Sequence, residues 1–268
     1  MACQFATFCQ GGSPIIAVAL HDGHYVRPEV QPYLKLSEEM RLREEDPYTG
    51  RWCEISDNRI IAHHSRFECD LNRPRAKAVY RTPEEAWGLD VWHHPVPDAV
   101  FERSLAQYDR FYQRLFGWID SLLKEHGRIV VVDLHSYNHR RGGPDSEPQD
   151  PRQNPEINLG TGSLNRQRWA DVVDRFITDL QSFEFLGRQL DVRENVRFQG
   201  GEMAKTLHAR YPANVCVLAV EVKKFFMNEW TAQLDTASYD AVRCALQSTV
   251  PGLLHVLGTK RHGAHQAV

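Results

Sequence analysis

The feature that most constrains this 268-residue chain is the segment Arg128–Arg140, RIVVVDLHSYNHR. It begins with the β-branched run Ile129–Val132, and so short an apolar run indicates a strand buried on both faces, as inside a parallel sheet. Asp133, His135 and Ser136 follow directly. Ligands of open α/β sheets bind beyond the carboxyl ends of the strands. Hydrogen bonds to a loop would be enough to explain an isolated Asp-x-His. A functional role for Asp133 and His135 therefore depends on which side chains lie at the ends of the other strands.

Two further apolar runs end in groups that can carry chemistry. Pro14–His21, PIIAVALH, is expected to form a strand that ends at His21, which suggests a site shared with His135. Asn214–Val222, NVCVLAVEV, is expected to form a second buried strand, with Glu221 near its end. A buried ionised glutamate is costly unless it is paired or functional, and a raised pKa there suits a general acid or base. We therefore favour a catalytic role for Glu221 over a buried salt bridge.

A carboxylate after the first strand can complete a metal site with the two histidines. Asp46 precedes Pro47, which biases it toward an extended conformation and out of the preceding helix, so it is the best candidate. Glu45 is the substitute. His24, three residues after His21, is either another ligand, a substrate contact or a solvated loop residue. Two histidines and one acid form a catalytic zinc set that leaves a position open for water.

Cationic groups near the same strand ends can hold an anionic substrate. Arg59–Asn72 is expected to form two short strands in a hairpin-like unit, with Asn72 and Arg73 at its exit, where they can anchor a carboxylate. Arg141 lies in a long polar loop that leaves His135, and it either meets the substrate or is simply solvated. Residues 138–163 of this loop are a candidate lid. Together these groups predict zinc-dependent hydrolysis of an amide in a substrate with a free carboxylate.

Helical and strand patterns alternate along the chain, without internal repeats or a long linker. This alternation predicts one α/β domain over residues 1–258, with a mixed, mostly parallel sheet, and a disordered tail over 259–268. Thr82 and Glu85 are expected to form a capping box. Short strands are expected at 156–159 and 192–198. Helices are expected over residues 34–43, 97–126, 165–183, 201–211 and 237–257.

Composition excludes several classes of partner. The net charge of -3 gives no electrostatic case for nucleic acid or an anionic membrane. No apolar run approaches the roughly 18–20 residues of a membrane span, and the N-terminus has no basic region typical of a signal peptide. The six cysteines form no C-x-x-C motif, so we expect a reduced, cytoplasmic protein.

Six stretches of the chain resemble the N-formylglutamate amidohydrolases, the deformylases of histidine degradation. The matching stretches, in family order, are ALHDGHYVRPE, EEDPYTG, SRFECDLNRPR, VVDLHSYNHR, RFQGGEMAKTLHARYP and LAVEVKKFFMNEW. This family is in turn similar to aspartoacylases and zinc carboxypeptidases, which share a three-layer α/β/α sandwich. The resemblance therefore implies that fold, a zinc cofactor and a small N-acyl amino acid substrate, with N-formyl-L-glutamate the first candidate.

The resemblance also implies roles for individual residues. His21 and His135 would be metal ligands, Glu221 the general base, Asn72 and Arg73 the contacts to the substrate carboxylate. Arg66 lies where the wider group keeps an arginine that steadies the developing oxyanion.

One position departs from the wider group. Carboxypeptidases and aspartoacylases place the acidic ligand three residues after the first histidine, where this chain has His24. The acidic ligand is therefore moved to Asp46, and Asp133 is expected to orient a ligand histidine from behind. Two alternatives stay open: a metallopeptidase that acts on peptide C-terminal residues, and a binding protein for N-acyl amino acids without catalysis.

Overall fold

The computed structural model describes residues 4–93 and 95–258, so the expected tail over 259–268 lies outside the described residues. A seven-stranded sheet runs through the described part in the order β1-β3-β2-β4-β7-β5-β6. The strands are β1 (Ala6–Cys9), β2 (Ile15–Ala19), β3 (Asn58–Ala62), β4 (Ile129–Tyr137), β5 (Ile157–Gly160), β6 (Val192–Glu194) and β7 (Val215–Lys223).

The four central strands β3, β2, β4 and β7 run parallel to one another. At the edges, β1 pairs antiparallel with β3 and β5 antiparallel with β7, while β6 runs parallel to β5. The mixed, mostly parallel sheet predicted from the sequence is thus confirmed. Because the central strands are parallel, their carboxyl ends meet at one edge of the sheet.

Five of the six α-helices in the described residues follow the predicted order, with boundaries that shift by a few residues, and the short helix α2 was not predicted. They are α1 (Glu38–Glu44), α2 (Thr49–Trp52), α3 (Asp98–His126), α4 (Ala170–Ser182), α5 (Glu202–Arg210) and α6 (Thr236–Val256). Among the described residues, none of these helices combines the length and apolar character needed to cross a bilayer. The cysteines in the described ranges, Cys9, Cys53, Cys69, Cys216 and Cys244, are free thiols.

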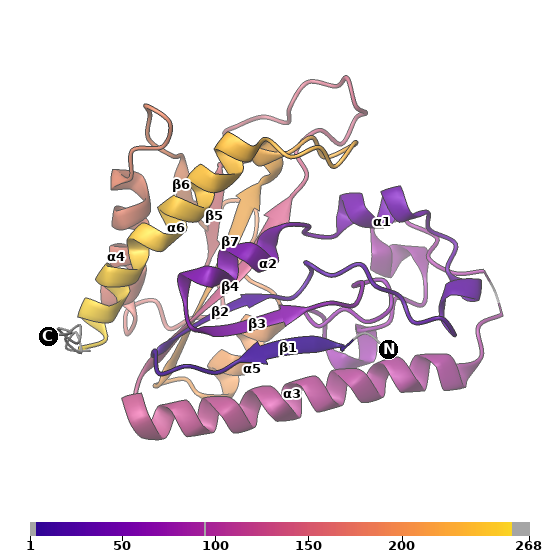
Figure 1. Ribbon diagram of the computed structural model, residues 1–268, viewed down its shortest axis with the longest axis horizontal. Coiled ribbons are helices and arrows are strands. Elements are labelled where there is room, and N and C mark those ends of the chain that lie inside the picture. The colour runs from indigo at the N-terminus through magenta and orange to yellow at the C-terminus, as the bar shows by residue number, and fades with distance from the viewer. Residues whose placement is uncertain (1–3, 94, 259–268) are drawn as a thin grey trace, which may run out of the picture.

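The central strands bury alternate side chains in two separate cores, one on each face of the sheet. Ile15 and Ala17 of β2 pack into the core that contains α2, α4 and α6. Ile16 and Val18 of the same strand pack into the core that contains α3 and α5. Figure 1 shows α3 along one side of the sheet and α4 and α6 on the other. This period-two alternation gives the expected α/β/α layers.

The prediction of a second strand within residues 59–72 is wrong. After β3, residues 66–73 form turns, with the amide N–H groups of Glu68 and Cys69 both donating to the carbonyl oxygen of Ser65. The alternating apolar residues that suggested a strand are buried in different places. Phe67 packs into a third apolar cluster, while Cys69 packs beneath α3. The true antiparallel partner of β3 is β1, which the sequence analysis missed.

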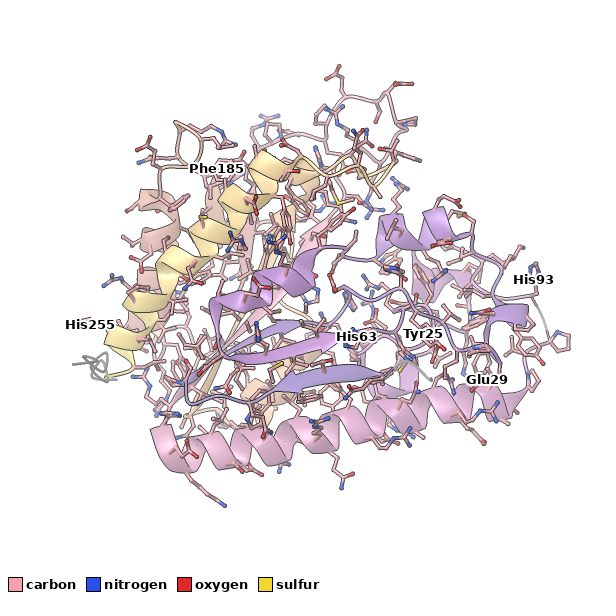
Figure 2. The ribbon with its side chains drawn as sticks, viewed as in Figure 1. Tyr25, Glu29, His63, His93, Phe185 and His255 are labelled. Atoms are coloured by element: carbon pink, nitrogen blue, oxygen red, sulfur yellow. The ribbon has the colours of Figure 1, made fainter. Side chains whose placement is uncertain are left out.

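The third apolar cluster builds a lobe beside the sheet from residues 26–36, Phe67, residues 79–93 and residues 95–101. The chain enters this lobe after β2, where the Tyr25 amide N–H donates to the His63 carbonyl oxygen over 3.1 Å. Figure 2 shows Tyr25 beside His63, with Phe185 and His255 on the far side of the sheet. The lobe therefore forms a wall beyond the strand ends.

The prediction of a capping box at Thr82 is also wrong. Thr82 precedes only a short 3-10 helix, Pro83–Ala86, and its side chain makes no capping hydrogen bond. The Glu85 carboxylate accepts instead from the amide N–H of Arg81, over 2.7 Å. After this short helix the chain passes through Trp87 in a left-handed conformation.

Candidate metal centre and catalytic cavity

Strand pairing brings the candidate catalytic groups together at the carboxyl edge of the sheet. His21 lies two residues beyond β2, and β2 pairs with β4, which carries His135. In the parallel pair of β4 and β7, His135 lies directly opposite Glu221. The two histidine rings lie 4.8 Å apart between centroids. The pairing of β2, β4 and β7 thus brings the three groups to one site.

Asp46 completes a set of three ligands with the histidines. Its Oδ2 atom lies 3.3 Å from His21 Nδ1 and 3.0 Å from His135 Nδ1, and the three ligand atoms all lie within 4.8 Å of one another. Ligands about 2.1 Å from a tetrahedral ion are separated by about 3.4 Å. The three side chains therefore fit a divalent ion such as zinc in both donor type and spacing.

The path of the chain after α1 selects Asp46 over the other acids. The Asp46 amide N–H donates to the His21 carbonyl oxygen over 2.9 Å, which ties this residue to the end of β2. The neighbouring Glu45 is buried and turns away, with its carboxylate accepting from Ser65 Oγ. His24 is exposed. Of the three open alternatives, Asp46 is the one that faces both histidines.

Each histidine uses its other ring nitrogen to contact a buried carboxylate. His21 Nε2 lies 2.8 Å from Asp70 Oδ1, and His135 Nε2 lies 3.1 Å from Asp133 Oδ1. Carboxylates in this position orient a ligand histidine and fix its tautomer. Asp133 was expected here, whereas Asp70 was missed. The available signal was an acid two residues before Asn72, in a segment misassigned as a strand.

The charges around the histidines favour a cation between them. Burial alone would lower the pKa of His135, but Asp133 and Asp46 raise it well above its ordinary value. Burial would also raise the pKa of Asp46, yet hydrogen bonds with His135 and His21 lower it. The carboxylates around His135 thus favour positive charge beside it, and a divalent ion can supply that charge as well as a proton can.

Glu221 stands next to this centre and is partly exposed to the cavity. Burial raises its pKa to about 8, against the opposing effect of His135. A carboxylate whose pKa lies this close to neutrality can take up and release a proton during a reaction.

A cavity of about 350 Å³ lies over the candidate metal centre. Its lining includes every site residue predicted from the sequence: His21, Asp46, Arg66, Asn72, Arg73, His135, Arg141 and Glu221. Trp87, Phe198 and Lys224 also line it, and the sequence analysis gave none of these a role. The structure therefore gathers the predicted residues around one cavity.

Asn72 is held in place by the start of α5. Its Oδ1 accepts from the Met203 amide N–H over 3.1 Å, and its Nδ2 lies 3.3 Å from His135 Nε2. A Cβ atom at Gly201 would lie 2.3 Å from the Asn72 amide, so only glycine permits this approach. The Gly-Gly helix start thus positions Asn72 in the cavity wall.

Arg66 faces the cavity from the turn after β3. Its Nη2 lies 2.8 Å from Asp70 Oδ2, and its Nη1 donates to the Glu44 carbonyl oxygen over 3.3 Å. The Tyr80 hydroxyl also donates to Asp70. One carboxylate therefore contacts both His21 and the arginine beside the candidate metal centre.

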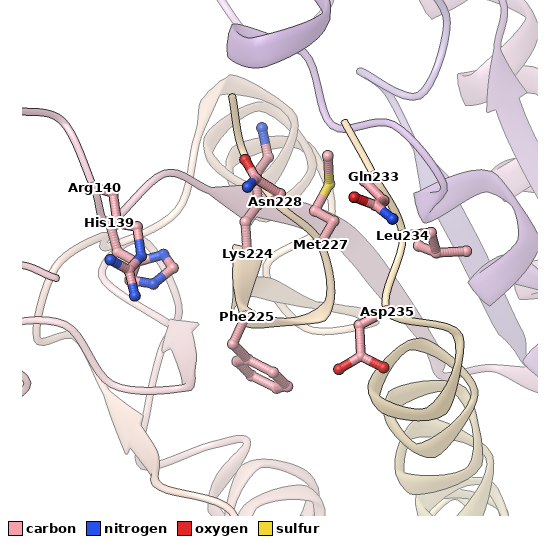
Figure 3. A pocket seen from close by; sticks show the side chains of 9 residues that line it. All are labelled: His139, Arg140, Lys224, Phe225, Met227, Asn228, Gln233, Leu234 and Asp235. Atoms are coloured by element: carbon pink, nitrogen blue, oxygen red, sulfur yellow. The ribbon is translucent and has the colours of Figure 1, made fainter. Parts of the chain in front are cut away.

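A second pocket, of about 480 Å³, shares Lys224 with the cavity. Figure 3 shows its lining: His139, Arg140, Lys224, Phe225, Met227, Asn228, Gln233, Leu234 and Asp235. The candidate metal ligands do not line it, so we place the chemistry in the smaller cavity. Lys224 Nζ donates to the carbonyl oxygens of Arg43 and Glu45, over 2.6 and 2.8 Å.

The loop after β4 is anchored at its base by Glu229. The Glu229 carboxylate accepts from the amide N–H groups of His139 and Arg140, over 2.7 and 2.9 Å. Arg141 extends from this base, with Nη2 3.4 Å from Glu44 Oε2. The lid role expected for residues 138–163 stays a prediction.

Comparison with known proteins gives matches to one family and to its fold. The family model described as N-formylglutamate amidohydrolase matches residues 13–227. The N-formylglutamate amidohydrolase from Ralstonia eutropha JMP134 superposes with a TM-score of 0.72 at 17% identity, covering 94% of this chain and 97% of that one. A gene product from Agrobacterium tumefaciens gives 0.65 at 16% identity, covering 96% and 97%. No curated protein matches the sequence significantly.

Proposed function

The chain belongs to the N-formylglutamate amidohydrolase family, and from that premise we propose that it is a zinc-dependent hydrolase of small N-acyl amino acids. The reaction cleaves the acyl amide and releases a carboxylic acid and a free amino acid. N-formyl-L-glutamate, which would give formate and L-glutamate, is the first substrate to assay because it appears in the family's name.

One observation supports this proposal above the others: Glu221 lies opposite His135 in the strand register, beside the set formed by His21, Asp46 and His135. Two histidines and one carboxylate leave coordination positions open, as catalytic zinc sites do. A neighbouring carboxylate with a raised pKa supplies the acid–base group that amide hydrolysis needs.

Each side chain then has a defined task. A bound zinc ion would supply Lewis acidity to the acyl carbonyl and to the attacking water. Glu221 would accept the proton of that water and deliver it to the leaving nitrogen. Arg66, fixed by Asp70, would face the oxygen that gains negative charge. Arg73 and Asn72 would hold the α-carboxylate, and so fix its distance from the acyl carbon.

The test combines metal analysis with turnover. We expect about one zinc per chain, and hydrolysis of N-formyl amino acids that is lost on chelation and restored by zinc. Glu221→Gln keeps the shape of the side chain but cannot accept the proton, so kcat should fall by about 10²- to 10⁴-fold. Zinc content of this variant, measured by mass spectrometry, should be unchanged.

The same assay separates the alternatives. Faster cleavage of a dipeptide than of a formyl amino acid would indicate a metallopeptidase. Binding of N-acyl amino acids without any turnover by zinc-loaded protein would indicate a binding protein, and a protein that neither retains zinc nor loses activity with chelator would refute the proposal.

A further inference from the structure

Trp87 is an unusual residue in the wall of the cavity. Its backbone is left-handed, with φ 56° and ψ 28°, a conformation that bulky side chains rarely adopt. Its side chain is also 47% exposed, although indole is among the largest apolar groups. Backbone strain and apolar exposure both cost free energy, and such costs cluster where a protein contacts its ligands.

The other non-glycine residues with left-handed backbones offer a comparison. In the described ranges these are Tyr48, Leu186, Asn195 and Ala232, and none of them lines the cavity. Tyr48 uses its hydroxyl to bind the Ala232 carbonyl oxygen, and Leu186 lies at the tip of a tight turn. Trp87 thus differs from them in presenting its exposed apolar surface to the candidate active site.

The indole ring is fixed between groups that belong to the site. The guanidinium carbons of Arg66 and Arg73 lie 4.8 and 5.5 Å from its centroid. The Tyr80 ring packs edge-on at 5.6 Å. Since Tyr80 and Arg66 both bind Asp70, the ring is held in one orientation relative to the ligand His21. A preorganised aromatic wall of this kind suits an apolar substrate group.

The arginines that line the cavity differ in how closely they are paired with carboxylates of the chain. Arg66 forms an ion pair with Asp70 at 2.8 Å, and Arg141 forms one with Glu44 at 3.4 Å. The ion pair of Arg73 with Asp70 is longer, at 3.9 Å, and 38% of the Arg73 side chain is exposed. Asp70 already accepts from several closer donors, so Arg73 has the weakest ion pair of the three arginines that line the cavity and is the first candidate to bind an incoming anion.

From these two observations we propose that the chain prefers N-acyl amino acids that carry a single carboxylate and a large apolar side chain. Arg73 binds the α-carboxylate, and the apolar side chain packs on Trp87. This inference rests on the proposed function and names its substrate class. It departs from N-formyl-L-glutamate, whose second carboxylate would have to compete with Glu44 for Arg141.

The first test compares kcat/KM for three substrates: N-formyl-L-phenylalanine, N-formyl-L-glutamate and N-formyl-L-alanine. The wild-type protein should favour the phenylalanine substrate over each of the others by about tenfold or more. Trp87→Ala should lower kcat/KM about tenfold more for the phenylalanine substrate than for the alanine substrate. Equal or better turnover of the glutamate substrate by the wild type would overturn the proposal.

Two further variants guard against a merely structural effect. Trp87→Gly should lose the same preference without strain, because glycine adopts a left-handed φ freely. Leu186→Ala is the matched control, since Leu186 is exposed and left-handed but far from the cavity lining, and it should leave all three rates unchanged. If both Trp87 variants kept the preference for phenylalanine, the indole would not be its source.

Glu44→Gln provides the reciprocal test. It releases Arg141 from its ion pair, so kcat/KM for N-formyl-L-glutamate should rise relative to phenylalanine. An unchanged ratio would contradict the charge argument.

A measurement without turnover separates this inference from the proposed function. N-formyl-L-phenylalanine should raise the melting temperature of zinc-loaded wild type more than N-formyl-L-glutamate does, and the difference should vanish in Trp87→Ala. If this pattern appeared without hydrolysis of any substrate, the proposed function would fail while the binding preference held. Hydrolysis without this difference in melting temperature would support the proposed function and refute the preference for an apolar side chain.

Discussion

At the scale of single residues, Asp70 connects the candidate metal centre to its surroundings. It is fully buried, and its two oxygen atoms contact His21 Nε2 on one side and Arg66 on the other. Burial opposes ionisation of this carboxyl group, but the charges of Arg66 and His21 lower its pKa well below the ordinary value. Asp70 is therefore a carboxylate that positions other side chains.

Replacing Asp70 with Asn should weaken zinc binding by about 10- to 100-fold, because the amide holds neither the His21 ring nor Arg66 as firmly. Titration against a chromophoric chelator measures this affinity directly. Asp109→Asn is the control, since Asp109 pairs with Arg75 on the surface. An unchanged affinity in Asp70→Asn would show that His21 does not depend on this contact.

The ionisation of Glu221 should set the acidic side of the pH profile. Burial raises its pKa to about 8 in the metal-free protein, and a general base works only as the carboxylate. A divalent ion nearby favours the ionised form, so in the zinc enzyme kcat/KM should fall as the pH drops through a value below 8. A rate that increases toward acid pH would exclude Glu221 as the base.

At the scale of elements, the end of α1 is capped by cations from other parts of the chain. Lys224 Nζ binds the carbonyl oxygens of Arg43 and Glu45, and Arg66 Nη1 binds that of Glu44. The last carbonyl groups of a helix lack partners within the helix, and cations stabilise them. Because Asp46 follows directly, this cap fixes where the candidate acidic ligand lies.

Lys224→Met should destabilise the fold and loosen the metal site together. The apolar side chain leaves buried carbonyl groups unpaired, which costs about 1–3 kcal/mol of unfolding free energy. Urea denaturation measures that loss, and chelator titration should show weaker zinc binding. Lys205→Met, on the exposed face of α5, should change neither quantity. If the Lys224 variant were less stable but bound zinc with full affinity, the cap of α1 would not determine the position of Asp46.

At the scale of the whole molecule, two cores on opposite faces of the sheet support a site built from buried charged groups. Glu229 shows what such a group contributes. Burial would raise its pKa, but the hydrogen bonds from His139 and from the amide N–H of Arg140 lower it to about 2. That a single domain spans residues 1–258 remains a prediction.

The depressed pKa of Glu229 predicts sensitivity to acid. A carboxyl group whose folded pKa lies below its unfolded pKa stabilises the protein fully above the unfolded value, here 4.5, and less as the pH falls toward 2. The contribution at neutral pH is on the order of 3 kcal/mol. Glu229→Gln should therefore flatten the dependence of unfolding free energy on pH across this range.

Urea denaturation at several pH values checks this expectation. The exposed Glu125→Gln should keep the wild-type slope. A Glu229 variant with an unaltered slope would show that other carboxylates cause the loss of stability in acid.

The sequence alone determined the parallel core strands and the residues at their ends. Runs such as Ile129–Val132 can only be buried, and parallel strands end at a common edge, so His21, His135 and Glu221 had to meet. Long helices such as α3 followed from their apolar periodicity, which is a local property.

Tertiary structure decided what depends on contacts between distant segments. Pro47 favoured Asp46 over Glu45 and His24 as the third group of the site, but only the hydrogen bond from the Asp46 amide to the His21 carbonyl oxygen fixed the path of the loop. The pairing of β1 with β3 and the support of His21 by Asp70 likewise join residues far apart in sequence. Local propensity and spacing carry no information about such contacts, because they form only when the loops pack against the completed sheet.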